Sequence, residues 1–415
     1  MNISRARSGW SQSYKAIGLL FIAGIVTTHG FFLWHVRDRI ARGDPDFTVF
    51  YTAARILREE RGAQLYDPAV QHVVQREFTS NALIRRGPLP FIHPPFEAVV
   101  FVPLTFLPYP VAFVVWDVVN LVMLVGVGLI LRSPTGLLRR IPLWIMSLAF
   151  LAFFPVFATF HQGQDSVLLL LLLALAFRAI ERGSDFAAGC WLGFGMFKYH
   201  LMLPLVLILI LWKGRKLAWG FIADVSVLFA ISLALVGWHG LLEYPGYAWR
   251  IVSVPAFGGI PLRQLPNLLG LLGGWPSLGD TGWLVRAVAL VGAVALLIMV
   301  AWLRRFTRDR RLFKLCFACA VVVSVLAGYS TNTYDLSLLL VPLALVADYI
   351  AEKNSESDLL VPIIPLLISP LWFFLWLRWE RINVMAFFLV WWLFAIRAEI
   401  LRTRRVKDTA AVPAV

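Results

Sequence analysis

Charge and cysteine are both scarce in this sequence of 415 residues, of which 15% are charged and three are cysteine. Soluble globular proteins carry about 25% charged residues and about 45–50% apolar ones. Here 60% of the residues are hydrophobic, and the excess extends along most of the chain. The shortage of charge therefore excludes an ordinary soluble domain and predicts an integral membrane protein.

The cysteines and the missing short motifs exclude several functional classes. Cys190, Cys316 and Cys319 lie in apolar runs, and the one CxxC pair has no second pair or histidine cluster with it. This pattern favours core packing over zinc or redox chemistry. The net charge of +14 comes without a zinc-finger spacing or a glycine-rich RNA-binding signature. Positive charge is expected beside the cytoplasmic ends of membrane helices, so no nucleic-acid partner is predicted.

The apolar runs are continuous, as in LVMLVGVGLIL and VLLLLLLALAF, whereas the strands of a membrane barrel alternate over about ten residues. The fold class predicted is therefore all-α, a polytopic helical bundle. About twelve spans are expected, with ten to thirteen possible because several runs are shorter than the roughly 20 residues that a perpendicular helix needs. The expected spans are 16–36, 97–131, 141–160, 166–180, 186–197, 200–212, 217–237, 283–303, 312–329, 336–350, 359–377 and 383–397.

The distribution of lysine and arginine predicts an orientation. With the N-terminus inside and twelve spans, the inside segments hold 23 of the 38 lysines and arginines. Nine more lie in the long segment 37–91, which the positive-inside rule largely ignores, so six remain outside. Both termini are therefore predicted to be cytoplasmic. The first apolar stretch lacks a small-residue cleavage site and is interpreted as a retained helix.

Two long outside loops follow from this orientation. The first, 37–95, contains FTVFYTAARILREE, whose apolar residues recur at helical spacing, so it is predicted to be helical. The second, 238–282, is rich in Gly, Pro and Trp and is interpreted as an ordered cap. We expect one integral membrane domain over 1–405, followed by a disordered tail, 406–415.

Polar and ionisable side chains gather at the predicted outer ends of the spans. Such groups are costly in or beside a membrane and indicate function by default. If the helices bundle, these ends face one cavity, where acids, amides, imidazoles and a lysine would handle a charged leaving group and a proton. The candidates are Asp44, Asp46, His93, His161, Gln164, Asp165, Lys198, His200, Asn332, Tyr334 and Asp335.

Each candidate also has a purely structural interpretation. Asp46, Asp165 and Asp335 each precede or begin a helix, where aspartate is a good N-cap. His93 stands before two prolines and is equally well a structural histidine. A lysine such as Lys198 often extends to the membrane surface while its stem stays in the apolar layer.

Five stretches together resemble a known family. They are DFTVFYTAARILREERGAQLYDP, FIHPPFEAVVFVPLTFLPYPVAFVVW, HQGQDSVLLLLLLALAF, AAGCWLGFGMFKYHLMLPLVLIL and YSTNTYDLSLLLVPLAL, and they run from about residue 44 to residue 347. In this order the series resembles the GT-C superfamily of membrane glycosyltransferases. Within it, the series is similar to glycosyltransferase family 87, the polyprenyl-phosphate-mannose-dependent mannosyltransferase-like proteins.

The resemblance implies roles for particular residues. Asp46 matches the family's early aspartate and would be the general base. Lys198 and Gln164, with Arg250 and Arg263 from the second loop, would bind the donor and its phosphate. Other residues would support the site or bind the acceptor: Asp44, Tyr51, Tyr66, Asp67, His93, His161, Asp165, His200, Asn332, Tyr334 and Asp335. The chain departs from the family where relatives often have Gly-Gln-Asn in place of Gly163-Gln164-Asp165 and Lys-Pro in place of Lys198-Tyr199.

The resemblance also implies a reaction. A single base without a carboxylate nucleophile fits one displacement with inversion, in which a sugar, mannose before arabinose, leaves a polyprenyl phosphate for a lipid or glycan acceptor. The absence of a nucleotide-binding fingerprint agrees with a lipid-linked donor. The expected location is the bacterial inner membrane, with the site on the periplasmic face and membrane lipids around it.

A cofactor is not expected. Asp44, Asp46 and His93 do not form a known metal-ligand spacing, although a divalent ion is not excluded. The alternative function is a transporter or flippase, which predicts a polar site near the bilayer midplane and broken helices in repeated halves. A non-catalytic membrane scaffold is a third interpretation, and it would tolerate the loss of Asp46.

Overall fold

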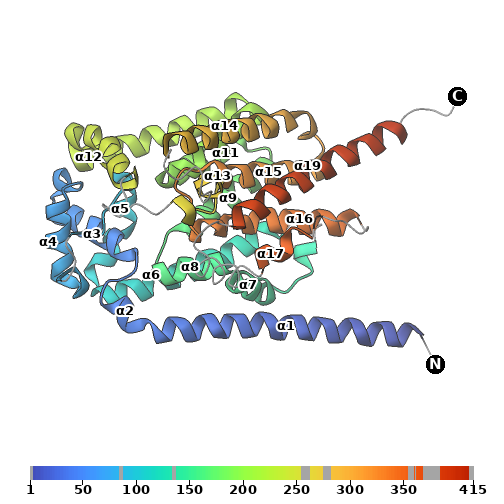
Figure 1. Cartoon of the computed structure of the whole chain (residues 1–415), viewed down its shortest axis with the longest axis horizontal. Coiled ribbons are helices and arrows are strands. Elements are labelled where there is room, and N and C mark those ends of the chain that lie inside the picture. The colour runs from blue at the N-terminus through green and yellow to red at the C-terminus, as the bar shows by residue number, and fades with distance from the viewer. Residues whose placement is uncertain are drawn as a thin grey trace.

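The structure is a computed structural model that describes residues 3–83, 87–132, 137–253, 262–273, 282–353, 359, 361–367 and 384–410. All elements in these ranges are helices, which confirms the predicted all-α class. Helix α1 (Ile3–His35) runs along one edge of the molecule (Figure 1) and packs against α7 (Leu143–Ala152). In the same view the N- and C-terminal ends lie at one end of the long axis, and α2–α5 lie at the other.

The prediction of twelve spans is wrong. Among the described residues, seven helices are long and apolar enough to cross a membrane, and an eighth span is added if a bent pair of helices counts as one. The seven are Ala16–His35, Tyr109–Leu131, Asp185–Lys213, Arg215–Ile251, Gly282–Phe306, Tyr334–Lys353 and Val384–Arg405. The bent pair joins α7 to α8 (Phe154–Gln162) at an angle of 75°.

Five of the expected spans account for most of the difference. The runs 186–197 and 200–212 form one candidate span, made of α10 (Asp185–Phe194), η5 (Gly195–Lys198) and α11 (Tyr199–Lys213). The runs 166–180 and 312–329 form α9 (Ser166–Glu181), which has only 16 residues, and α15 (Arg310–Ala327), which carries three basic residues. Both helices are mostly buried among their neighbours. Of 359–377, only 359 and 361–367 are among the described residues, with α17 at Ile363–Leu367.

Segment 37–95 is helical, as its sequence pattern predicted. Its elements are α2 (Arg37–Ala41), α3 (Phe47–Arg58), η1 (Gly62–Gln64), α4 (Pro68–Phe78) and η2 (Asn81–Leu83). An aromatic core around Phe47 and Phe50 joins them to α5 (Pro95–Phe101) and to the start of α6 (Tyr109–Leu131). The expected span 97–131 therefore divides, because α5 and η3 (Val102–Phe106) are separated from α6 by the turn at Pro108.

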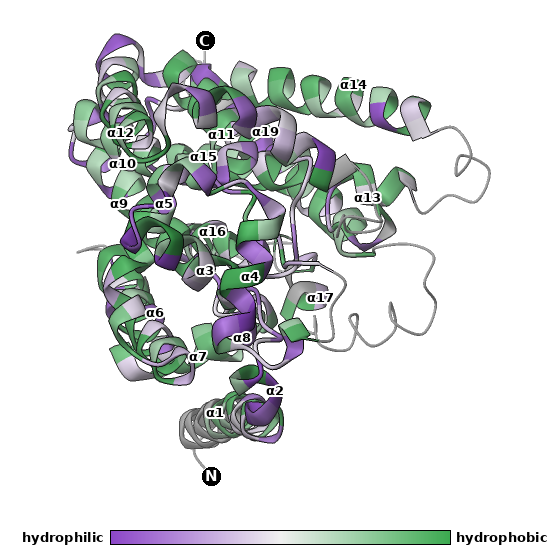
Figure 2. Cartoon of the chain, turned by 90° about the vertical axis from the view of Figure 1, so that its left-hand side faces the viewer, coloured by the Kyte–Doolittle hydropathy of each residue, from purple (hydrophilic) through white to green (hydrophobic). Residues whose placement is uncertain are grey.

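The second long segment begins as a helix. Helix α12 (Arg215–Ser253) continues past a kink at Gly237, where φ is 70° and the backbone is not helical. Its second half lies beside α3–α5 at the end of the bundle that faces the viewer in Figure 2, where α2 and α4 are rich in hydrophilic residues. η7 (Leu262–Gln264) and α13 (Leu268–Gly273) follow.

The remaining elements complete the bundle. They are η4 (Leu137–Arg139), α14 (Gly282–Ala301), η9 (Trp302–Phe306), η10 (Tyr334–Leu339), α16 (Leu340–Lys353) and α19 (Val384–Ala410). One hydrophobic core runs through α9, α11, α15 and α16. The polar residues that follow lie where this core meets the aromatic core of segment 37–95. The predicted boundary of the tail lies inside α19, because that helix continues to Ala410, and 411–415 lie outside the described residues.

Candidate active site

Lys198 lies at the centre of a buried ionic network. It ends η5, at the break between α10 and α11, and its side chain is 3% exposed. Its Nζ is 2.6 Å from Asp335 Oδ1 and 2.8 Å from Asp165 Oδ1, and it donates to Ser166 Oγ at 2.7 Å. Lys198 therefore does not extend to a surface, and two carboxylates already compensate its charge.

The two carboxylates reach Lys198 from different elements. Asp165 precedes α9, but its side chain caps no backbone N–H there. Although burial acts to raise it, the pKa of Asp165 is lowered, because the Lys198 ammonium stabilises the charged form. Asp335 lies in η10, where its Oδ2 accepts the backbone N–H of Asn332 at 2.8 Å and its Oδ1 accepts the Ser166 hydroxyl at 3.0 Å.

Asp46 is connected to this network through Gln164. Asp46 stands at the start of α3, yet its side chain does not cap that helix. Its Oδ2 instead accepts the Gln164 amide N–H at 2.7 Å, and Tyr334 is a second side-chain partner. The Gln164 amide oxygen lies 3.5 Å from Lys198 Nζ. Burial raises the pKa of Asp46 above its ordinary value of 3.8, against the opposing hydrogen bond from Gln164.

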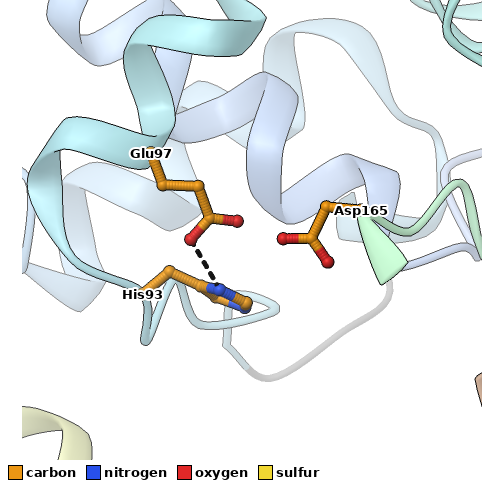
Figure 3. A group of neighbouring side chains, drawn as sticks. All are labelled: His93, Glu97 and Asp165. Atoms are coloured by element: carbon orange, nitrogen blue, oxygen red, sulfur yellow. Dashed lines mark ion pairs between the residues drawn. The ribbon is translucent and has the colours of Figure 1, made fainter. Parts of the chain in front are cut away.

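His93 and Glu97 lie next to Asp165 (Figure 3). Pro94 and Pro95 start α5 directly after His93, which puts residues 93 and 97 one helical turn apart. His93 Nδ1 lies 2.7 Å from Glu97 Oε2, and Glu97 is 2% exposed. Burial lowers the pKa of His93 to about 4, so its imidazole is neutral at pH 7. Burial, together with the nearby Asp165 carboxylate, raises the pKa of Glu97 well above its usual range.

Seven of the sixteen predicted residues line one small polar cavity of about 70 Å³. Its walls include His93, Gln164, Lys198, His200, Asn332, Tyr334 and Asp335. An apolar cavity of about 270 Å³ adjoins it, because Tyr329 and Ser330 line both. Leucines and alanines of η7, α13 and α14 form most of the apolar wall. A polar cavity that continues into an apolar one suits a ligand with a polar head and a hydrocarbon chain.

Several predicted residues lie elsewhere. Asp44 accepts hydrogen bonds from Arg39 at 2.9 Å and from Asn81, away from the network. Tyr51 donates to the Leu107 carbonyl within the aromatic core. The Asp67 side chain accepts the N–H of Ala69 and caps α4.

The other predicted residues lie at the edge of the site or apart from it. Tyr66 supports it from outside by donating to the His93 carbonyl at 2.8 Å. His161 stacks on Phe157. Arg250 lines a separate polar cleft of about 480 Å³ with Tyr66 and Asp67. The side chain of Arg263 lies outside the described residues.

Two residues of the network were missed from the sequence. Glu97 was counted within the apolar run 97–131, although an acid in such a run is itself a functional signal. Its position four residues after His93 was a second signal, since residues at this spacing face each other on a helix. Ser166 gave no signal, because a serine after Asp165 is common at a helix start.

Comparison with known proteins identifies the family. Residues 91–328, more than half of the chain, match the family described as Glycosyltransferase family 87. The chain belongs to glycosyltransferase family 87. This confirms the resemblance inferred from the five stretches, and the matched residues include His93, Gln164 and Lys198. No solved structure matches the chain.

Two relatives of this family 87 protein match it over short stretches. Both are named polyprenol-phosphate-mannose-dependent alpha-(1-2)-phosphatidylinositol pentamannoside mannosyltransferase. The protein from Mycolicibacterium smegmatis is 36% identical over 91 residues, which cover 21% of this chain and 22% of the relative. The protein from Mycobacterium tuberculosis is 36% identical over 95 residues, or 20% of each chain. The chain thus spans about a fifth of the length of these relatives.

Proposed function

We propose that this chain is an inverting glycosyltransferase that transfers a sugar, mannose first among the candidates, from a polyprenyl phosphate to a lipid or glycan acceptor on the extracytoplasmic side. The observation that carries this proposal is the hydrogen bond of 2.7 Å between Gln164 and Asp46. Asp46 is the partly exposed carboxylate of the network, and this bond connects it to Gln164, which lines the polar cavity. The family, and the donor named for its two relatives, support the same reaction class.

Asp46 acts as the general base in this proposal. Asp165 and Asp335 are paired with Lys198, and Glu97 contacts His93. Among the described residues, Asp46 is thus the carboxylate of the network that contacts neither an ammonium nor an imidazole. In one displacement, Asp46 takes the proton of the acceptor hydroxyl while the acceptor oxygen bonds to the anomeric carbon. The bond from that carbon to the phosphate oxygen breaks, and the phosphate leaves with the electron pair. Base assistance of this kind contributes about 10²–10⁴-fold.

The apolar cavity supports a lipid-linked donor. Its wall is formed by residues such as Leu265, Leu268 and Leu290, with Arg286 as a basic member. A polyprenyl tail is a hydrocarbon chain and would be stabilised there by burial of apolar surface. Its phosphate would then lie near Tyr329 and Ser330, where the apolar cavity meets the polar one.

The separate polar cleft is suited to the acceptor. Tyr66 and Tyr247 line it together with the carboxylates of Asp67 and Glu243. Tyrosine rings and carboxylates are the groups that contact the faces and hydroxyls of a sugar, by stacking and by accepting hydrogen bonds. Tyr66 lines the cleft and donates to the backbone carbonyl of His93, which lines the polar cavity. The same tyrosine therefore contributes to both. The acceptor of the relatives, a phosphatidylinositol mannoside, combines a sugar with an anionic group that Arg250 would bind.

A pair of aspartate substitutions tests the proposal. Purified protein is assayed in detergent with polyprenyl-phosphate mannose and a phosphatidylinositol mannoside acceptor. Asp46→Asn is expected to lower kcat by about 10²–10⁴-fold because it removes the base, with donor binding retained. Asp44→Asn is the matched control, since it lies two residues away and pairs with Arg39 and Asn81 outside the cavity.

Two outcomes would contradict the proposal. Full activity of Asp46→Asn would remove the base assignment. Transfer from a nucleotide sugar, but not from the polyprenyl phosphate, would remove the lipid donor and leave the family membership intact.

A further inference from the structure

We propose that His93, Glu97 and Asp165 form a binding site for one divalent ion of the Zn²⁺ or Mn²⁺ class. One imidazole nitrogen and two carboxylate oxygens of these residues lie within 4.8 Å of one another. Metal–ligand bonds to nitrogen and oxygen are about 2.0–2.2 Å long, so ligand atoms that share one ion lie roughly 3–4 Å apart. A small rotation of the side chains would close the set around an ion.

The set has the chemistry of a metal site open at one position. Three protein ligands that leave one position for water or substrate are the usual arrangement of catalytic zinc. A mixture of imidazole and carboxylate suits Zn²⁺ and Mn²⁺ better than Mg²⁺ or Ca²⁺, which take oxygen ligands. Figure 3 shows the carboxylates of Glu97 and Asp165 directed at each other, with the His93 ring next to them.

The two carboxyl groups are buried next to each other. Glu97 is 2% exposed and Asp165 is 0% exposed. The two carboxyl groups hydrogen-bond to each other, and Lys198 donates to Asp165. Two carboxylates this close repel each other unless a proton or a cation lies between them. Each also has a nitrogen neighbour: His93 Nδ1 lies 2.7 Å from Glu97 Oε2, and Lys198 Nζ lies 2.8 Å from Asp165 Oδ1. Buried carboxylates are costly unless they are paired, hydrogen-bonded or coordinate a metal.

The charge balance of the network favours a cation. Four carboxylates, those of Asp46, Glu97, Asp165 and Asp335, lie around the single ammonium of Lys198 among the described residues. His93 and His200 also face the network, and burial keeps the His93 imidazole neutral. Asp165 and Asp335 alone exceed the charge of Lys198 by one. Ionisation of Asp46 and Glu97, which a bound cation would favour, adds two more negative charges, and a divalent ion offsets two of the three. Lys198 holds one Asp165 oxygen and leaves the other for the ion.

The site goes beyond the proposed function, because it is argued from its ligands alone. If the proposed reaction holds, the ion would lie beside the cavity where negative charge grows on the leaving phosphate, and a fixed positive charge there stabilises the transition state. The ion would supply positive charge for the phosphate, whereas the charge of Lys198 is already compensated by two carboxylates. The expectation of no cofactor, which considered Asp44, Asp46 and His93, would then be revised by a different ligand set.

Metal binding to the full-length protein in detergent tests the site. The protein is stripped with EDTA, and binding of Mn²⁺ is followed by electron paramagnetic resonance and of Zn²⁺ by calorimetry. Wild type is expected to bind one ion per chain, with at least a tenfold weaker affinity in His93→Ala and in Glu97→Gln. His239→Ala is the matched control, because His239 Nε2 and Glu243 form an exposed pair with the same i,i+4 spacing at 3.1 Å. Its metal binding is expected to equal that of wild type.

The outcomes distinguish a bound metal ion from a proton shared between the carboxylates. If wild type binds neither ion more tightly than the His93→Ala/Glu97→Gln double variant, the site is overturned and the carboxylates share a proton instead. Where Glu97→Gln does not fold, as judged by gel filtration and thermal unfolding, His93→Asn replaces it. Sugar transfer is measured on the same preparations: transfer that survives EDTA with no metal bound removes the role of the ion in the reaction and leaves the proposed function standing. Metal bound without any transfer leaves the site standing and contradicts the proposed function.

Discussion

At the scale of single residues, Gln164 is the connection between two parts of the molecule. Its side-chain N–H donates to Asp46 on α3, while its backbone carbonyl accepts the Trp116 indole N–H and the Asn120 amide from α6. Gln164 is buried, so its own side chain is protected from water. A residue held in this way fixes the position of the Asp46 carboxylate without itself reacting. Gln164 is therefore a positioning residue.

The pH dependence of transfer should reveal this role. A base must be deprotonated to act, so activity falls as the pH falls through the pKa of Asp46, and burial puts that pKa above the ordinary 3.8. The hydrogen bond from Gln164 acts in the opposite direction and lowers the pKa. Gln164→Leu is expected to lower kcat/KM about tenfold and to move its acid limb to higher pH. An unmoved acid limb would show that Gln164 does not act on Asp46.

The polar residues of the site were largely predictable from the sequence, and the reason is physical. Gln164, Lys198 and Asp335 interrupt apolar runs, where a polar group is costly unless it has a role. Their partners were not predictable, because ion pairs between α9, η5 and η10 depend on how the helices pack. Glu97 was overlooked because it was counted as part of a span, whereas α5 is a separate short helix.

At the scale of elements, the turn between α8 and α9 brings Gln164 and Asp165 into the site. Gly163 has φ of +59°, a left-handed conformation that L side chains rarely adopt. A Cβ at this position would lie 2.7 Å from the Cβ of Phe47 and 2.8 Å from the ring of Phe113. Glycine is therefore required both by the backbone and by the close approach of α3 and α6.

Gly163→Ala should accordingly affect both stability and activity. Left-handed backbone at a non-glycine residue costs about 1–2 kcal/mol. The contact with Phe47 Cβ cannot be relieved by a side-chain rotation, because the backbone of α3 fixes that atom. We expect a lower temperature of thermal unfolding in detergent and at least a tenfold loss of kcat. Gly183→Ala is the matched control, because Gly183 also has positive φ, at 76°, but no neighbour within 4 Å. Equal effects of the two substitutions on activity would contradict the packing argument.

Helices as elements were predicted well, but their division into spans was not. An apolar run of about 16–18 residues is compatible both with a spanning helix and with a helix buried in a bundle. α9 and α15 pack as helices buried in a bundle. Every residue of α15 from Leu312 to Leu326 is buried by protein, as are most residues of α9. The sequence placed a break at Lys198, between the runs 186–197 and 200–212, but hydropathy does not distinguish two spans from one broken span, because both runs are strongly apolar.

At the scale of the whole molecule, the positions of the two ends bear on the predicted orientation. The N- and C-terminal ends lie at one end of the long axis, while α2–α5 lie at the other, as Figure 1 shows. Many exposed basic residues, including Arg304, Arg305 and Arg308, follow α14. The charge count predicts that these residues and both termini are cytoplasmic. The same orientation would put Asp46 and the polar cavity on the extracytoplasmic side, where lipid-linked donors are proposed to act.

Single-cysteine labelling in intact cells tests this orientation. The native Cys190, Cys316 and Cys319 are free and are first replaced with alanine. Arg76→Cys, at an exposed position of α4, is expected to react with a membrane-impermeant maleimide added to intact cells. Arg308→Cys, also at an exposed position, is expected to react only after the cells are permeabilised. The reverse pattern would place the cavity on the cytoplasmic side, where nucleotide sugars are available, and would remove the main physical reason for a lipid-linked donor.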